Sequence, residues 1–394
     1  MSEVKKTQAQ AAAKGKAPGE LPGKVASGKA TDKLLTNREL NRALLARQML
    51  LTRVKLPVLE AIEKLFGMQA QSQNAPYYGL WSRVEGFRHE ELSGLLKDKQ
   101  VVRMALMRST LHLVSSPDAL QLRPLLQPVM DRGLKGAFGK QLIGIDQEAL
   151  AAAGREFVEK KPMTFQEMGM RLCEHSPGLT PEAAAAVVRN RVPLVQIPPR
   201  GIWGESGQAV HTSIEAWLGQ SLSLSPEPEW LIRRYLEAFG PATVKDIQVW
   251  SGLTRMSEVI KSLRPELVTF QNEQGEELFD LPDAPRPDAD TPSEPRFLGE
   301  FDNMLLSYAD RSRVMDEACR KRVFTVNGII RATFLVDGYV SGTWKLTSGR
   351  HGTELHIEPF CKLTEQERDA LSEEGTRMLQ FAVSKEAASI IIFH

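Results

Sequence analysis

The feature that most constrains the fold of this chain is a threefold repetition of helices followed by a pair of short strands. In each unit, apolar residues at helical spacing come first, and a hairpin pattern with a tight turn follows. This periodicity by itself predicts repeated α+β modules. We place them at residues 37–146, 147–227 and 228–282.

Helix-capping signals mark the start of helices in all three units. Thr36 or Asn37 can cap the first helix with Glu39 in its first turn, Thr164 forms a capping box with Glu167, and Thr243 precedes a helix that begins with Asp246 in its first turn. The strand pairs are expected at residues 101–114, 194–204 and 267–281. Helices followed by a hairpin are typical of winged-helix modules, in which one helix meets the duplex and the hairpin forms the wing.

The remaining residues form two flanks and a linker. Residues 283–295, with the proline before them, hold five prolines and several aspartates and are typical of a linker. Residues 296–394 combine a hairpin around Asp337-Gly338, an amphipathic helix opened by Thr364 and extending to about residue 385, and a final strand at 390–393. We expect a mostly antiparallel α+β domain there, so the fold class is α+β with tandem winged-helix modules.

Residues 1–36 are predicted to form a disordered basic tail. They hold seven lysines and almost no large apolar side chain, so they cannot bury enough apolar surface to order themselves. Two interpretations remain open. The segment is a solvated tail, or it is a basic arm that adds salt-sensitive affinity for DNA phosphates.

Composition limits the classes of protein to consider. A chain of 394 residues is too long for one ordinary core, and a net charge of +1 requires any DNA-binding surface to be a local basic patch. Cys173, Cys319 and Cys361 lie far apart without C-x-x-C spacing, which argues against a structural zinc site. We expect no metal and no cofactor. The sequence has no apolar run of membrane-spanning length, so we expect a cytoplasmic monomer, nucleoid-associated when bound to DNA.

Two glutamines separated by one small residue are the strongest candidates for chemistry. In extended chain, side chains two positions apart point the same way, so Gln69 and Gln71 would present two carboxamides side by side. Such a pair can hold and aim a water but cannot deprotonate it. This suits a reaction whose leaving group departs readily. The alternative is a polar turn between two elements, because Gln-x-Gln is common.

A strand with polar residues on one face is expected beside this pair. If residues 107–114 alternate, Arg108, Thr110 and His112 share one face and can grip phosphate or line a lesion pocket. The alternative is an exposed strand face, or a buried structural histidine at position 112.

Other cations are candidates for DNA contact. Arg200 would lie at the tip of the second hairpin, where it can enter a narrow minor groove, or it is simply solvated at a tight turn. Arg311 and Arg313 follow Asp310 in a loop of the C-terminal region and either pair internally or meet phosphate.

Seven segments resemble the bacterial winged-helix DNA glycosylase family, which includes AlkZ-type enzymes that unhook interstrand crosslinks and a sister branch represented by YcaQ. The matching segments are LFGMQAQ (65–71), PYYGLWSR (76–83), VRMALMRSTLHLV (102–114), FGPAT (239–243), WSGL (250–253), LSYADRSR (306–313) and GTW (342–344). The resemblance runs from about Asn37 to the C-terminus. The family motif is Gln, an aliphatic residue, then Gln in the AlkZ branch or Asp in its sister. Gln69-Ala70-Gln71 therefore resembles the AlkZ branch.

The resemblance implies a monofunctional DNA glycosylase that acts on double-stranded DNA with alkylated purines, including bulky adducts or interstrand crosslinks. Gln69 and Gln71 would be the catalytic residues. A purine alkylated at N7 carries a positive charge and leaves neutral, so the absence of a carboxylate from the motif fits this substrate. The motif also lacks a lysine, so a Schiff-base lyase step is not expected. The alternative is a winged-helix DNA-binding or regulatory protein without catalysis.

Overall fold

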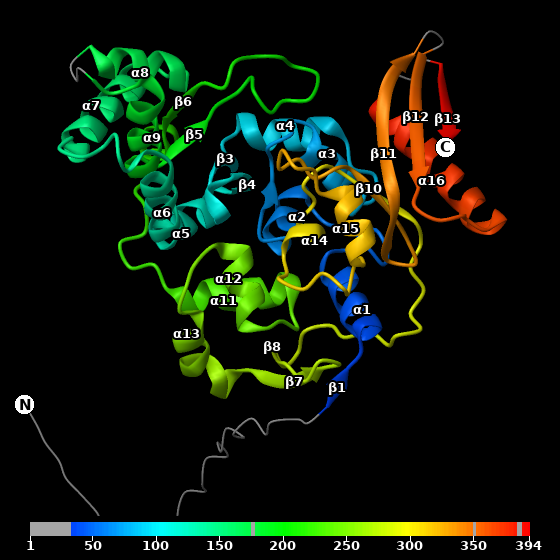
Figure 1. Cartoon of the computed structure of the whole chain (residues 1–394). Coiled ribbons are helices and arrows are strands. Elements are labelled where there is room, and N and C mark those ends of the chain that lie inside the picture. Colours follow the sequence, from blue (N-terminus) through cyan, green and yellow to red (C-terminus); the bar gives the residue numbers. More distant parts are fainter. Residues whose placement is uncertain (1–32, 175–177, 350–351, 384–387) are drawn as a thin grey trace, which may run out of the picture.

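The structure is a computed structural model that describes residues 33–174, 178–349, 352–383 and 388–394. It is a mixed α+β protein with three sheets (Figure 1), so the predicted α+β class is confirmed. Among the described residues, no helix is long and apolar enough to span a membrane. The predicted tail falls almost wholly on residues outside the described ranges.

The N-terminal part supplies most of the helices around the glutamine motif. Its elements are β1 (Leu34–Leu35), α1 (Asn37–Arg47), α2 (Val58–Lys64), β2 (Met68–Gln69), α3 (Ala75–Trp81), α4 (His89–Lys97), β3 (Val101–Ala105), the 3₁₀ helix η1 (Met107–Ser109), β4 (Leu111–Ser115), α5 (Ser116–Leu125) and α6 (Gln127–Phe138).

A helical cluster follows and returns to the same sheet. Its elements are α7 (Gln147–Lys160), α8 (Phe165–Cys173), α9 (Pro181–Arg191), β5 (Leu194–Gln196), β6 (His211–Ser213) and α10 (Ile214–Leu218). The five-stranded sheet has the order β2-β4-β3-β5-β6, so β5 pairs with β3 across the predicted boundary at residue 147. Helices α7 to α9 have a core of their own, built from residues 142–194.

The third part lies in the lower half of Figure 1. It comprises α11 (Pro228–Phe239), α12 (Val244–Ser251), α13 (Met256–Leu263), the 3₁₀ helix η2 (Arg264–Glu266), β7 (Val268–Asn272) and β8 (Glu277–Asp280). The hairpin expected at residues 267–281 is confirmed, and β1 adds to it as a parallel strand beside β7. Residues 34 and 35 are therefore part of a sheet, and the predicted tail extended too far at its C-terminal end.

The C-terminal part is a sheet with one long helix. Its elements are β9 (Arg296–Leu298), α14 (Asn303–Leu306), α15 (Glu317–Val323), β10 (Thr333–Val336), β11 (Tyr339–Gly349), β12 (Gly352–Pro359), α16 (Glu365–Ala382) and β13 (Ser389–Phe393). The order is β13-β12-β11-β10-β9, antiparallel except for the β12–β13 pair. The sheet of residues 296–394 is mostly antiparallel, as expected, but its buried residues share cores with the N-terminal part.

Two predicted strand pairs differ from the structure. Residues 107–109 form a 3₁₀ turn, so the alternating face expected for residues 107–114 begins only at Leu111. The strand pair expected at 194–204 is also wrong, because β5 pairs with β6 and residues 197–210 form a long connection. Pro198 and Pro199 have no N–H to donate, so they cannot continue a ladder.

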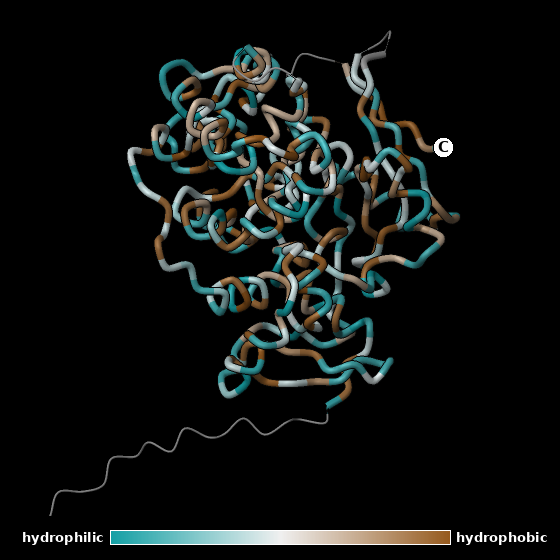
Figure 2. Tube along the Cα trace, turned by 60° about the vertical axis from the view of Figure 1, so that its left-hand side comes forward, coloured by the Kyte–Doolittle hydropathy of each residue, from teal (hydrophilic) through white to brown (hydrophobic). Residues whose placement is uncertain are grey.

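The predicted linker has no helix or strand, but it is packed along α1. Arg38, Arg42 and Arg47 donate hydrogen bonds to carbonyl oxygens of Ala289, Thr291 and Pro285. One large core runs from Leu44 to Val340 and mixes residues of the first, third and C-terminal parts. In Figure 2, brown and teal alternate along the helices, as expected for elements with one buried face.

Candidate active site

The two glutamines lie at the edge of the five-stranded sheet, in contact with each other. Strand β2 is only two residues long, and Gln69 stands opposite His112 of β4. The Nε2 of Gln69 donates a hydrogen bond to the Oε1 of Gln71. Gln69 is buried with 6% of its surface exposed, whereas Gln71 is exposed. The pair thus has a buried member that is held and an outer member that reaches solvent.

Arg108 fixes the orientation of the buried amide. Its Nη2 lies 2.8 Å from the Oε1 of Gln69, and its Nη1 donates to the backbone oxygen of Trp250 in α12. A guanidinium has only donors, so the Gln69 atom that faces it must be the carbonyl oxygen. The Gln69 amide nitrogen is then directed at Gln71. The Gln71 amide nitrogen makes no hydrogen bond to any described residue, so both of its N–H groups are available.

Backbone contacts hold the motif on both sides. The Ala70 nitrogen donates to the Leu111 oxygen at 2.8 Å, and the Ala70 oxygen accepts from Nη2 of buried Arg103 at 2.9 Å. From α14, the Asn303 amide donates to the Gly67 oxygen, and its Oδ1 lies 3.4 Å from the Gln69 nitrogen. These contacts pre-organise the segment without using the glutamine side chains.

Gly67 provides the backbone conformation that leads from α2 into β2 and the glutamine motif. Its φ is +85°, a region that favours glycine, and a Cβ there would lie 2.4 Å from the Val114 side chain. A larger residue would therefore displace β2 from β4 and move the glutamines.

His112 is buried beside the pair and stays neutral. Its Nδ1 lies 2.9 Å from the Thr110 backbone oxygen, which can only accept, so Nδ1 carries the proton and Nε2 does not. Burial and the charge of nearby Arg108 lower the pKa of His112 to about 3. Burial also lowers the pKa of Arg108, to about 10, which leaves it protonated at neutral pH. The site therefore has a permanent cation and an uncharged imidazole.

The turn that carries Arg108 has an unusual backbone. Arg108 and Ser109 have φ values of 54° and 59°, which are rare for residues with side chains. This turn brings the guanidinium of Arg108 between β2 and α12, which a regular strand face would not do. Thr110 donates its hydroxyl to the Met107 oxygen at 3.0 Å and is partly exposed next to the turn.

The remaining predicted DNA-binding residues divide into two groups. Arg311 is half-buried, donates to the Leu305 oxygen at 2.8 Å, and is close enough to Arg108 for the two charges to repel. Arg200 is partly exposed in the long connection, away from a hairpin tip, with a hydrogen bond to the Gly207 oxygen. Arg313 is buried, donates to the Pro241 oxygen at 2.8 Å and lies 4.0 Å from the Tyr308 ring. Because Arg313 is buried, the expected phosphate contact is wrong, and Arg313 has the alternative role of an internal contact.

Sequence reasoning did not identify Asn303 or Arg103 as part of the site. Asn303 is separated from Gln69 by 234 positions, and nothing in local spacing links the two. Arg103 lies in the apolar strand β3 and donates a hydrogen bond to the backbone oxygen of Ala70. The spacing of residues in the sequence does not indicate such a buried arginine. Both contacts depend on tertiary packing.

Comparisons with known proteins agree on one family. The model of the AlkZ-like DNA glycosylase family matches residues 62–381. The interstrand DNA cross-link repair glycosylase of Streptomyces sahachiroi is 24% identical over 372 residues, which cover 87% of this chain and 92% of that protein. The solved structure of Streptomyces sahachiroi DNA glycosylase AlkZ superposes with a TM-score of 0.74 at 20% identity, covering 91% of this chain and all of that one. This chain is a member of the AlkZ-like DNA glycosylase family.

Proposed function

We propose that this protein is a monofunctional glycosylase that hydrolyses the N-glycosidic bond of N7-alkylated purines in duplex DNA, with a water positioned by Gln69 and Gln71. The observation that carries the proposal is the ordered set of contacts from Arg108 to Gln69 to Gln71. It ends on an exposed amide whose N–H groups have no partner among the described residues. A polar turn has no need of a buried guanidinium to orient its side chains.

The chemistry of the leaving group explains why amides suffice. A purine alkylated at N7 is cationic, so cleavage of its glycosidic bond releases a neutral base and leaves an oxocarbenium-like sugar. No proton has to be supplied to the base. His112 is neutral with a pKa of about 3, so it is a poor acid at neutral pH. The free lone pair of the Gln71 oxygen and its N–H groups can hold the attacking water by hydrogen bonds.

In this proposal, the positive charge of Arg108 acts on the water through the amides of Gln69 and Gln71. Arg108 withdraws electron density through the Gln69 carbonyl, which makes the Gln69 N–H a better donor to Gln71. Arg108 itself is a positioning residue, because its donors are directed at Gln69 and Trp250. Its positive charge beside a cationic sugar is unfavourable, so the two intervening amides also separate the charges.

The natural substrate is proposed from the relatives. The Streptomyces sahachiroi relative is named as an interstrand DNA cross-link repair glycosylase, and the matched region contains the whole glutamine motif. We therefore extend the substrate class to bulky adducts and interstrand crosslinks. Thr110, Arg200 and Arg311 remain proposed DNA contacts, with a monomer bound to duplex DNA in the nucleoid.

The direct test is to incubate the purified protein with a duplex that carries a single N7-methylguanine and to measure abasic sites. The proposal predicts base release without strand cleavage, because no lysine serves as a Schiff-base nucleophile in the motif. Duplex binding with no abasic sites on any N7-alkylated substrate would instead favour a non-catalytic DNA-binding protein.

A further inference from the structure

The turn of residues 325–329, between α15 and β10, exposes two apolar side chains. Val326 is fully exposed, and Ile329 is 47% exposed. Apolar residues that are exposed singly are ordinary on a protein surface, but two on one short turn form a concentrated apolar tip. Neither side chain belongs to a core of the described residues, so both are available to a ligand.

Hydrogen bonds hold the 325–329 turn in one conformation. The Thr325 nitrogen donates to the Ile329 oxygen at 2.9 Å, and the Gly328 nitrogen donates to the Thr325 oxygen at 3.1 Å. The Ile329 nitrogen donates to the Thr325 hydroxyl oxygen at 3.0 Å, and a bridge between Phe324 and Ile330 closes the base of the turn. A tip that is ordered before binding loses little conformational entropy when it contacts a ligand.

Both ends of the turn lie beside the glutamine site. The Phe301 nitrogen donates to the Ile330 oxygen at 3.3 Å, and Phe301 lines a small cavity next to the buried glutamine. At the other end, the guanidinium of Arg311 lies 5.1 Å from the centre of the Phe324 ring. Arg311 is also the cation that is close enough to Arg108 for the two charges to repel. The turn therefore starts and ends next to residues that surround the site.

Cations flank the tip, and no carboxylate lies among them in the sequence. Residues 318–331 contain Arg320, Lys321, Arg322 and Arg331 but no Asp or Glu. Lys321 and Arg331 are exposed and form no ion pair within the described chain. An apolar tip between free cations suits a nucleic-acid duplex, because its phosphates are anionic and the faces of its stacked bases are apolar.

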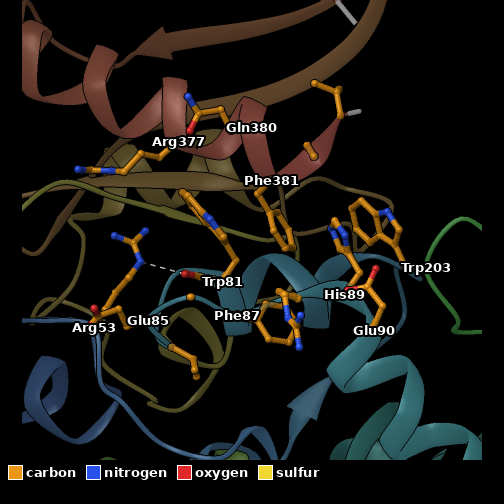
Figure 3. Close-up of a pocket in the computed structure, with 15 residues that line it drawn as sticks. Arg53, Trp81, Glu85, Phe87, His89, Glu90, Trp203, Arg377, Gln380 and Phe381 are labelled. Carbon is orange, nitrogen blue, oxygen red and sulfur yellow. Dashed lines mark hydrogen bonds between the residues drawn. The ribbon is translucent and has the colours of Figure 1, made fainter. Parts of the chain in front are cut away.

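A second apolar feature, the pocket of about 700 Å³ between the end of α3, the start of α4 and α16, lacks this combination (Figure 3). The centre of the His89 ring lies 3.9 Å from that of Trp203 and 4.1 Å from that of Phe381, so these rings already contact one another. None of the residues that line the pocket belongs to the segment 65–75. The pocket is therefore an internal aromatic contact that lies apart from the glutamine motif.

We infer that the 325–329 turn is a wedge that inserts Val326 between stacked bases beside the damaged nucleotide, with Ile329 covering the opened step. Lys321 and Arg331 bind the phosphates on either side. The inference rests on the proposed function, because it takes the ligand to be duplex DNA held at the glutamine site. Unstacking a base step costs least where a base is damaged or missing, so a rigid apolar wedge favours such sites. The opened stack would give the water held at Gln71 access to the glycosidic bond.

The test uses a duplex with a tetrahydrofuran abasic analogue and, next to it, a 2-aminopurine, whose fluorescence rises when the base unstacks. The apolar variant combines Val326→Ser with Ile329→Ser, and the charge variant combines Lys321→Ser with Arg331→Ser. Leu224→Ser is the matched control, because Leu224 is an almost fully exposed apolar side chain in the connection between α10 and α11. The measured quantities are the fluorescence rise on binding, the Kd for the duplex, and the slope of log Kd against log salt concentration.

The inference predicts that the wild type and Leu224→Ser raise the fluorescence by about twofold or more, and that the apolar variant loses most of this rise. The apolar variant should bind about tenfold more weakly at an unchanged salt slope, because it removes apolar contact and no charge. The charge variant should lower the salt slope by about two, one for each phosphate contact.

A full fluorescence rise in the apolar variant, or no rise in the wild type, would overturn the inference. An apolar variant that lowers the salt slope as much as the charge variant would also overturn it, because the turn would then act only by placing cations on phosphates. Release of N7-methylguanine by the wild type is measured in parallel. A rise that depends on Val326 without any base release would support the wedge and contradict the proposed function alone.

Discussion

At the scale of single residues, the site is a short series of oriented hydrogen bonds. Arg108 faces the oxygen of Gln69, and the nitrogen of Gln69 faces the oxygen of Gln71. Each amide is thereby held in one of its two possible orientations, which fixes where its donors and acceptors lie. Pre-organised groups of this kind cost no reorganisation at the moment of reaction.

Replacing either glutamine by alanine would remove part of the proposed water site. We expect Gln69→Ala and Gln71→Ala each to lower single-turnover release of N7-methylguanine by about 100-fold, as for loss of other pre-organised donors. Gln73→Ala is the matched control, because Gln73 donates to the oxygens of Ile202 and Glu205, away from the pair. Thermal unfolding should change little in the exposed Gln71 variant. A rate near that of the wild type in the Gln69 and Gln71 double variant would remove both residues from the mechanism.

A substitution at Arg108 distinguishes a role in positioning Gln69 from a role in phosphate contact. Arg108→Lys keeps the charge but loses the fork that bridges Gln69 and Trp250. We expect kcat to fall by about tenfold or more, with duplex affinity and its salt dependence nearly unchanged. An arginine that binds phosphate would show the opposite pattern, namely weaker binding at an unchanged kcat.

The buried histidine predicts how stability depends on pH. The pKa of His112 is about 3 in the folded protein, below its usual value near 6.5, because of burial and Arg108. Between these two values the unfolded chain binds the proton and the folded chain does not, so the free energy of unfolding falls as the pH drops. Denaturant titrations from pH 7 to pH 4 should show this loss. A smaller loss is expected in His112→Gln if the variant folds, whereas the same pH dependence in that variant would contradict the assignment.

At the scale of elements, α14 connects the C-terminal part to the motif. Its cap residue Asp302 pairs with Arg83 through two hydrogen bonds of 2.8 and 2.9 Å, and both side chains are almost fully buried. This ion pair sets Asn303 against the backbone at Gly67 and Gln69. The position of the glutamines thus depends on a contact between residues more than 200 positions apart.

Breaking that ion pair should be costly. Arg83→Met leaves Asp302 as an uncompensated buried charge, and we expect the free energy of unfolding to fall by about 3–5 kcal/mol. Arg320→Met is the control, because Arg320 and Glu317 form an exposed pair on α15 and their removal should cost less than about 1 kcal/mol. Equal effects in urea titrations would show that the buried pair does not hold α14 in place.

Local signals were enough to predict many elements. The capping boxes of Thr36 with Glu39, Thr164 with Glu167, and Thr243 with Asp246 are all present, because a cap depends on residues three apart. The turn at Arg108 and the pairing of β5 with β6 were not predicted. Tertiary packing decides both a positive φ at residues with side chains and a strand partner 15 or more residues away, and local spacing does not report it.

At the scale of the whole molecule, the site is assembled from four distant segments. Gln69 and Gln71 come from β2 and the residues after it, Arg108 from η1, Trp250 from α12 and Asn303 from α14. The sequence identified the glutamines and the arginine because they lie in recognisable motifs. It left Arg108 open between phosphate and a lesion pocket, and Arg313 open between phosphate and an internal pair. The contacts that bury both side chains join segments far apart in the chain, so local spacing could not decide.

With a net charge of +1, the cations that contact DNA phosphates must be clustered on one face. Binding to undamaged duplex should weaken steeply with salt, because cations near the site must displace counterions from phosphate. Deleting residues 1–32 removes six lysines and should lower the salt slope modestly without changing the rate on a saturating N7-methylguanine duplex. Residues 34 and 35 are kept because they pair with β7. A lost catalytic rate in the truncated protein would place the tail in the site.

Whether two amides hold the attacking water is decided by a side-by-side excision panel with N7-methylguanine, N3-methyladenine and uracil in otherwise identical duplexes. The wild type and the Gln69→Ala, Gln71→Ala double variant are compared under single-turnover conditions. A water held by two amides, with His112 neutral, predicts rapid release of the two cationic purines, no measurable release of uracil, and loss of both activities in the double variant. Efficient removal of uracil by the wild type would show that an acid operates in the site, and would contradict this account.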